Sequence, residues 1–572
     1  MSEVVEVSTL QRARLAHQPP VTPTLRGRTT LRRHAHPTSS LAQPEEIEKR
    51  LPHIFGQPRV ELEAASTAGD DASHSPLRIG VVLSGGQAAG GHNVIAGLFD
   101  YVAAGHPHSK LYGFIGGPIG LVKGDFIVID APLVAKYRNQ GGFDIIGAIA
   151  LHHSRVDQKN LLAESKRADK IETDKQLLAS RVVCENLALD GLVIIGGDDS
   201  NTNAALLAEY FKSHHLKTNV VGVPKTIDGD LKSSLGVEVS FGFDTACMIY
   251  SELIGNIATD ANSSRKYYHF IRLMGRSASH ITLECALQTR PNITLIGEEV
   301  AARKQTLSDL TNELCHVIVE RAKAGKNFGI VLLPEGLIEF VPEVHRLISE
   351  LNELMAKGNS ADVVGEKLTE ESRAVFDFLP SAIRHELLLD RDPHGNVQVS
   401  KIETEKLFIH LVTKELKRRK ANGQFKGSFS AMGHFFGYEG RCGLPSNFDS
   451  NYCYALGRTA GALLDHGLTG YMASVSNLTA PPEQWKSGGL PLTALMNMER
   501  RKGKNVPVIR KALVDLDAAP YKELLRHREK WARGEHYRNP GPIQFYGPAS
   551  GEVNITLQLE FGQAHRHPKA AL

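Results

Sequence analysis

This 572-residue sequence has no closely spaced pair of cysteines and no long apolar run, and its net charge is small. The six cysteines are scattered and none forms a CxxC pair, which argues against a disulfide framework or a zinc site of paired cysteines and fits a reducing compartment. No apolar run approaches the roughly 20 residues that a membrane-spanning helix needs. The formal net charge is +3, so bulk charge gives no reason to expect nucleic-acid binding. We therefore expect neither a membrane nor a nucleic-acid partner, and any anion site must be local.

The first 45 residues differ from the rest in composition. They combine arginines with proline, serine and threonine, and they carry no acidic residue between Glu6 and Glu45. No apolar signal-peptide core is present. We predict a disordered basic extension over 1–45 and a cytoplasmic location, while the arginine-rich composition leaves organelle targeting open.

Beyond Leu77, short apolar runs alternate with helical patterns, and each run ends in glycine, proline or polar residues. This alternation indicates parallel sheets built from βαβ units, so the predicted fold class is α/β. The candidate strands are 79–83, 111–115, 192–195, 220–223, 270–273 and 330–333.

Two charged segments are predicted to be insertions in this α/β pattern. Residues 152–175 are densely charged, and residues 343–426 are long, charged and compatible with helices. The basic run at 414–420 is interpreted as the solvated face of a helix rather than as a binding surface.

The most informative motif is Gly-Gly-Asp-Asp at 196–199, which lies between an apolar strand and a helix. The carboxyl end of such a strand and the start of the next helix are where α/β sheets bind anions. Two carboxylates there oppose a bare anion. Asp198 and Asp199 therefore indicate either a metal ion that accompanies the anion or the exclusion of an unwanted ligand.

A second loop, at 224–230, follows the next candidate strand and contains a lysine, a hydroxyl and two carboxylates. Asp228 lies about one βαβ step after Asp198, so both are expected at one sheet edge. Lysine can neutralise a phosphoryl group, and a carboxylate can take a proton from an attacking hydroxyl. The alternative is an Asx-type turn with solvent-facing charges.

Further loops follow the same strand-to-helix pattern. Residues 84–93 contain four glycines, which let backbone N–H groups approach phosphate oxygens. Three later loops offer guanidinium, carboxylate and phenol groups suited to a sugar phosphate. The whole constellation favours metal-assisted phosphoryl transfer to a polyol, and no Ser-His-Asp arrangement is evident. The residues concerned are Arg276, Glu335, Tyr438 and Arg441.

The ordered motifs GVVLSGGQAAGGHN, GGDDSNTNAA, PKTIDGDL, LMGRSASHITLE, PEG and HFFGYEGR resemble the phosphofructokinase family over about 44–500. Within it, the chain is similar to the long pyrophosphate-dependent form of the catalytic beta type. The resemblance implies two Rossmann-like three-layer α/β domains with parallel-rich sheets, a cleft between them and helical insertions. It implies a donor domain at 46–270, a sugar-phosphate domain at 271–440 and a segment at 441–572 that packs on both.

The resemblance also implies a role for individual residues. Asp228 would be the catalytic base, Asp198 would hold Mg²⁺ and Asp230 would assist. Lys225, Thr226 and Arg276 complete the implied catalytic set. The implied substrate-binding residues are Gly85, Ser200, Arg167, Lys225, Thr226, Asp228, Met274, Gly275, Arg276, Glu335, Lys426, Tyr438 and Arg441.

Two positions bear on the phosphoryl donor. ATP-dependent members of the family typically carry glycine where Asp199 and Lys225 stand here. Two like charges about 4 Å apart repel by roughly 4 kcal/mol at an effective dielectric of 20, so Asp199 would weaken ATP binding by about three orders of magnitude.

The expected reaction is therefore reversible, Mg²⁺-dependent phosphoryl transfer from pyrophosphate to the 1-hydroxyl of fructose 6-phosphate, which gives fructose 1,6-bisphosphate and phosphate. An ATP-dependent 6-phosphofructokinase and a non-catalytic regulatory subunit are the alternatives. The family further implies a homo-oligomer or an alpha/beta hetero-oligomer.

Overall fold

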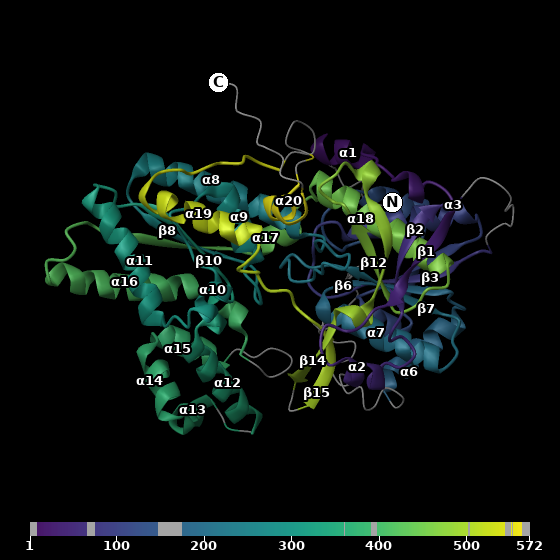
Figure 1. The fold of residues 1–572 in the computed structure, drawn as a ribbon, viewed down its shortest axis with the longest axis horizontal. Helices are drawn as coiled ribbons and strands as arrows, with labels where there is room; N and C mark the ends of the chain where they lie inside the picture. The colour runs from purple at the N-terminus through teal and green to yellow at the C-terminus, as the bar shows by residue number, and fades with distance from the viewer. Residues whose placement is uncertain are drawn as a thin grey trace, which may run out of the picture.

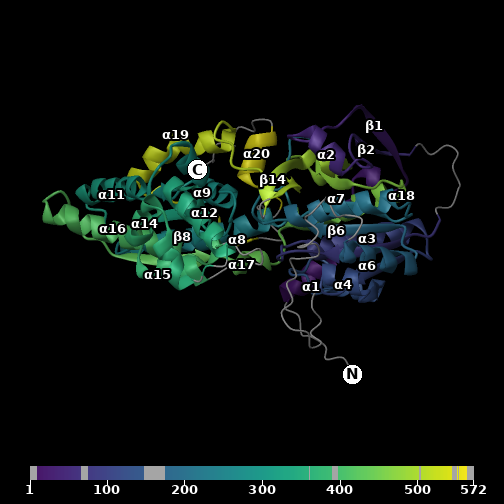
Figure 2. The same cartoon turned by 90° about the horizontal axis from the view of Figure 1, so that it is seen from below.

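The computed structural model describes residues 9–65, 75–146, 174–357, 359, 361–389, 397–501, 504–543, 551 and 553–562. The chain forms two lobes, each built on its own β-sheet (Figures 1 and 2). A nine-stranded sheet has the order β1-β2-β13-β12-β7-β6-β3-β4-β5, and a four-stranded sheet has the order β11-β8-β10-β9. The predicted α/β class is confirmed.

The centre of the larger sheet is parallel and its two margins are antiparallel. Alternate residues of the central strands enter different cores: Val193 packs on the face of the sheet that bears α3 and α18, and Ile194 packs on the face that bears α7. Burial on both faces explains why these strands are continuous apolar runs. The strands are β1 (Thr29–Pro37), β2 (Pro58–Ala64), β3 (Arg78–Leu83), β4 (Lys110–Phe114), β5 (Phe126–Ile129), β6 (Gly191–Gly196), β7 (Asn219–Pro224), β12 (Tyr471–Ser476) and β13 (Lys486–Pro491).

Helices cover this sheet on both faces. They are α2 (Pro44–Arg50), α3 (Gly91–Gly105), α4 (Pro118–Lys123), α5 (Ala131–Tyr137), α6 (Lys175–Asn186), α7 (Asp198–Ser213) and α18 (Asn447–Asp465). The predicted insertion at 152–175 lies outside the described residues except for its last two positions, where α6 begins.

The smaller sheet is wholly parallel. Its strands are β8 (Tyr268–Leu273), β9 (Ile293–Thr294), β10 (Gly329–Pro334) and β11 (Ala431–Phe436). The helices of this lobe are α8 (Phe243–Ser264), α9 (His280–Thr289), α10 (Gly297–Ala302), α11 (Leu307–Lys323), α12 (Pro342–Ala356), α13 (Ala361–Val364), α14 (Glu370–Phe378), α15 (Ser381–Leu389), α16 (Thr404–Ala421) and α17 (Tyr438–Arg441). Helices α12 to α16 occupy most of the segment predicted as a helical insertion.

The prediction of a disordered N-terminal extension is wrong for the described residues 9–45. Helix α1 (Thr9–Ala16) packs near α5, and β1 pairs with β2 at the margin of the large sheet. Arg14 is buried, and its guanidinium donates to the backbone carbonyls of Asn139 and Pro445. Buried hydrogen bonds from an arginine to main-chain carbonyls stabilise a docked segment, and composition alone does not reveal such partners.

The C-terminal segment connects the two lobes. After β13 it forms the hairpin of β14 (Met496–Arg501) and β15 (Lys504–Ile509), which packs beside α7. It then crosses to α19 (Ala519–Arg533) and α20 (Ile555–Phe561), which pack on α9 in the other lobe (Figure 1). None of the helices in the described ranges combines the length and apolar character that spanning a bilayer requires.

Candidate active site

Three neighbouring strands of the large sheet end together at one edge. Strands β3, β6 and β7 are parallel, with Leu83 opposite Ile195 and Gly196 opposite Pro224. The predicted placement of the Asp198 and Asp228 loops at one edge is thereby confirmed, because each loop directly follows one of these strands.

The glycine loop after β3 lies against the other two loops. Gly85 has a φ of 81°, and a Cβ added to it would lie 3.2 Å from Lys225 Nζ. Ser200 Oγ donates to Ser84 Oγ at 2.8 Å, which joins the first turn of α7 to this loop. The backbone N–H groups of the glycine loop thus lie close to the Lys225 ammonium and to the start of α7, an arrangement that is suited to binding phosphate oxygens.

Lys225 is a buried cation at the centre of the edge. Its Nζ donates to the carbonyl of Gly86 at 2.6 Å. Burial and the nearby Arg441 lower the pKa of Lys225 to about 7, against the opposing pull of Asp228 and Asp198. A polyanionic ligand would restore the charge, because it lowers the cost of keeping the ammonium protonated.

The loop after β7 holds two carboxylates in different surroundings. Asp228 N donates to Thr226 Oγ1 at 3.1 Å, and Asp228 Oδ1 is buried with no hydrogen-bond partner among the described residues. Burial, reinforced by Asp228 and Asp198, raises the pKa of Asp230. A buried carboxylate oxygen left without a partner is costly unless a ligand supplies one, so Asp228 is equipped to accept a proton.

The carboxylates are compatible with Mg²⁺ only when a ligand contributes to the metal site. In the described part of the chain, no group of three or more His, Cys, Asp and Glu side chains is close enough to hold a metal by itself. Mg²⁺ commonly binds through one or two carboxylates together with substrate phosphates and water. Asp198, with Asp230 nearby, matches that donor set, and Asp198 already interacts with several cations of the site.

The second half of the site follows the strands of the small sheet. Met274 N donates to the carbonyl of Phe436, and Glu335 N donates to that of Leu273. These bonds bring the loops after β8, β10 and β11 to one edge, where Arg276 and Tyr438 are exposed.

Arg441 joins the two halves. Its Nε lies 3.1 Å from Met274 Sδ, and its Nη1 donates to the carbonyl of Gln87 at 3.2 Å. A Cβ added to Gly86 would lie 3.1 Å from the same Nη1. The guanidinium is therefore held between the glycine loop after β3 and the loop after β8, where it can bind anions on either side.

One predicted residue, Lys426, is not brought to the site by the structure. Lys426 is exposed and precedes β11, so it lies at the amino ends of the small sheet, about 20 Å of strand from the loops described above. The structure therefore places Lys426 away from the loops that carry the other predicted sugar-phosphate residues. Arg167 lies outside the described residues. Asp199 lies in the first turn of α7, beside Asp198 as predicted.

One residue of the site was missed by the sequence reasoning. Lys511 Nζ donates to Ser277 Oγ at 2.7 Å and lies 3.7 Å from Asp198 Oδ2. A single lysine after a hairpin, more than 300 residues from its partner carboxylate, carries no local pattern that predicts this position.

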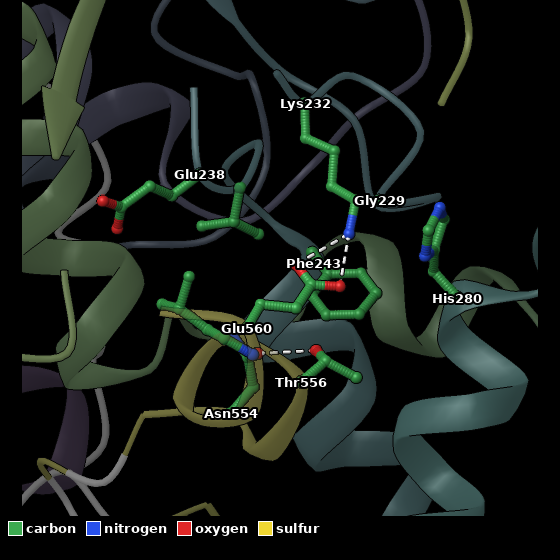
Figure 3. A pocket seen from close by; sticks show the side chains of 10 residues that line it. Gly229, Lys232, Glu238, Phe243, His280, Asn554, Thr556 and Glu560 are labelled. Carbon is green, nitrogen blue, oxygen red and sulfur yellow. Dashed lines mark hydrogen bonds and ion pairs between the residues drawn. The ribbon is translucent and has the colours of Figure 1, made fainter. Parts of the chain in front are cut away.

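A separate pocket lies behind the Asp228 loop, where Gly229 and His280 form part of its wall (Figure 3). Lys232 Nζ donates to both carboxylate oxygens of Glu560, at 2.7 and 2.8 Å. Helix α20 thus closes one side of this pocket by an ion pair. The pocket does not contain Asp228 or Lys225 among its lining residues.

The chain is similar to known phosphofructokinases in sequence and in fold. The family model described as phosphofructokinase matches residues 78–464. The chain is 54% identical over 557 residues to the pyrophosphate–fructose 6-phosphate 1-phosphotransferase subunit beta of Solanum tuberosum, covering 97% of this chain and 94% of the relative. It is 50% identical over 577 residues to the pyrophosphate–fructose 6-phosphate 1-phosphotransferase of Treponema pallidum, with 97% of each chain covered.

Among solved structures, a pyrophosphate-dependent phosphofructokinase from Nitrosospira multiformis aligns with a TM-score of 0.51 and 15% identity, covering 83% of this chain and 95% of that one, which shows the shared fold. The family match and the sequence identity show the family of the chain as well as its fold. The chain belongs to the phosphofructokinase family.

Proposed function

We propose that this protein transfers a phosphoryl group reversibly from pyrophosphate to the 1-hydroxyl of fructose 6-phosphate, giving fructose 1,6-bisphosphate and phosphate, with Mg²⁺ as cofactor. The observation that carries this proposal is the buried Lys225, held beneath the glycine loop at 2.6 Å from the Gly86 carbonyl, with Asp199 in the adjoining helix turn. The names of the relatives support it. We further propose that the chain works as a homo-oligomer or with an alpha-type partner, since one relative is named as a subunit.

The residues divide the reaction between them. Asp228 Oδ1 accepts the proton of the sugar hydroxyl as its oxygen bonds to the phosphorus, and the departing phosphate keeps the electron pair of the broken P–O bond. Lys225 stabilises the charge that develops on the donor. Mg²⁺, when held by Asp198 with Asp230, would neutralise charge on the donor phosphates. Arg276 and Arg441 position the acceptor.

The donor can be decided by offering MgPPi and MgATP in parallel to the purified protein with fructose 6-phosphate. We expect turnover with pyrophosphate and a kcat/KM for ATP lower by about three orders of magnitude, because Asp199 repels an additional phosphate. A preference for ATP would contradict the proposed donor. A folded protein that binds fructose 6-phosphate but turns over neither donor would favour a regulatory subunit.

Glu335 makes the binding of fructose 6-phosphate depend on pH. Burial and the nearby Asp228 raise the pKa of Glu335 to about 7, against the opposing pull of Arg272 and Arg441. Below that pH its carboxyl is neutral, and above it the carboxylate accepts hydrogen bonds from sugar hydroxyls more strongly. We expect the affinity for fructose 6-phosphate, measured by calorimetry, to rise as the pH increases through about 7.

Two variants test this assignment. Glu335→Gln should remove the part of the pH dependence that comes from this carboxyl and leave the titration of the ligand phosphate. Asp228→Asn should move the midpoint of the Glu335 part to lower pH, because it removes one of the charges that raise the pKa. An unchanged pH profile in Glu335→Gln would rule out Glu335 as the titrating group.

A further inference from the structure

The segment at 509–514, here called the crossing segment, runs from β15 in the large lobe to the small lobe. At its start, Ile509 N donates to Thr202 Oγ1 of α7 at 2.9 Å. Ala512 N donates to the carbonyl of Asp230 at 2.7 Å. Both contacts belong to elements that form the donor side of the active site, so the crossing segment is fixed to the loop that carries the proposed catalytic base.

The crossing segment is also fixed to the small lobe. His280 Nε2 donates to the carbonyl of Ala512 at 2.9 Å, since a carbonyl oxygen can only accept. Val514 N donates to Glu298 Oε1 at 2.9 Å. His280 is also one of the residues that line the pocket of Figure 3. These backbone contacts hold the segment on both sides without any help from the Lys511 side chain.

Lys511 extends from this fixed backbone into the donor side. One of its three N–H donors goes to Ser277 Oγ at 2.7 Å, while Asp198 Oδ2, at 3.7 Å, is beyond hydrogen-bond reach. A quarter of the side chain is exposed. The ammonium therefore retains donors for a ligand that enters beside Asp198.

The negative charges near Lys511 explain why a cation at this position would help a polyanion to bind. Asp198 and Asp199 are adjacent carboxylates in the first turn of α7, where pyrophosphate, itself a polyanion, has to bind. Like charges at short range oppose binding unless a cation lies between them. Lys511 Nζ lies 3.7 Å from Asp198 Oδ2, and Lys225 Nζ binds the Gly86 carbonyl of the glycine loop.

We infer that Lys511 is a donor-binding residue, whose ammonium, delivered by the C-terminal segment, binds pyrophosphate oxygens beside Asp198. This inference rests on the proposed function. Lys511 lies beyond residue 464, the last residue that the family model matches, so the region covered by that model does not contain the whole donor site. A purely structural ion pair is the less suitable explanation, because the crossing segment is already held by the backbone contacts of Ala512 and Val514.

The test compares the full-length protein with Lys511→Met, Lys511→Arg and the control Lys522→Met, which alters an exposed lysine of α19. The dissociation constants of pyrophosphate, with Mg²⁺ and without sugar, and of fructose 6-phosphate are measured separately by calorimetry. We expect Lys511→Met to weaken pyrophosphate binding about 10- to 100-fold, as for loss of a hydrogen bond to a charged group, and to change fructose 6-phosphate binding less than twofold. Lys511→Arg should retain most of the affinity, and Lys522→Met all of it.

Unchanged pyrophosphate binding in a folded Lys511→Met protein would overturn the inference. So would equal losses for both ligands with a lower melting temperature, which would mark Lys511 as a structural tie. If Lys511→Met does not fold, Ser277→Ala should weaken pyrophosphate binding alone by a few-fold, and no loss would overturn the inference. A wild-type protein that prefers MgATP would refute the proposed donor instead. In that case, selective loss of MgATP binding in Lys511→Met would still support a donor-binding role.

Discussion

Replacing Asp228 by serine should lower kcat by about 10²- to 10⁴-fold in both directions, the range that a positioned general base contributes. Asp228 Oδ1 is buried and lacks a hydrogen-bond partner among the described residues, so it is free to take the proton of the sugar hydroxyl. A serine hydroxyl cannot hold that proton at neutral pH. Fructose 6-phosphate should still bind within about threefold of the wild-type affinity, because Arg276, Arg441 and Glu335 come from other loops. Steady-state rates and calorimetric binding on the same preparations measure the two effects.

The matched control is Asp517→Ser, which makes the same exchange at an almost fully exposed carboxylate next to α19. It should leave both rate and binding unchanged. A kcat within about threefold of wild type in Asp228→Ser would remove Asp228 as the base. A tenfold loss of fructose 6-phosphate affinity with a lowered melting temperature would assign Asp228 a structural role instead.

The local sequence pattern was sufficient to predict those parts of the site that consist of one strand and the loop that follows it. The apolar run before Gly196 is buried on both faces of the sheet, and the helix after Gly197 begins at Asp198. A strand buried on both faces has to be apolar throughout, and a turn into a helix favours glycine, so each part leaves a readable signal. Parallel pairing with β7 then brings the Asp228 loop to the same edge.

The features that were missed depend on partners distant in sequence. Strand β1 is mostly exposed and rich in arginine, so its own residues give no strand pattern, and its place is set by hydrogen bonds to β2. Lys511 comes within 3.7 Å of Asp198 only because the hairpin that precedes it packs on α7. Lys426 lies close to β11 in sequence, but it precedes the strand, whereas the loops of the site follow their strands. The local sequence pattern predicts where a loop lies in the chain, whereas the topology of the fold determines which distant residues come close to that loop.

Donor choice should shift toward ATP when Asp199 and Lys225 are both changed to glycine. Asp199 lies in the first turn of α7, where the resemblance to the phosphofructokinase family implies that its carboxylate meets an additional phosphate of ATP. Removing a like charge about 4 Å away should relieve roughly 4 kcal/mol at an effective dielectric of 20, which is about 10³-fold in affinity for ATP. Lys225→Gly should weaken the use of pyrophosphate, because the buried ammonium under the glycine loop is lost.

Separate single variants distinguish the two contributions. Asp199→Asn keeps the size of the side chain and removes its charge, so it should recover only the electrostatic part of the ATP affinity. Asp199→Gly also removes the side chain, so it should recover the steric part as well. Lys225→Gly alone should lower kcat/KM for pyrophosphate and leave ATP excluded by Asp199. The measurement is the ratio of kcat/KM for MgATP to that for MgPPi in wild type, the three single variants and the double variant.

A ratio in the double variant no higher than in wild type, with the fold intact, would mean that other residues exclude ATP. An increase in Asp199→Gly alone equal to that of the double variant would show that Lys225 takes no part in donor choice.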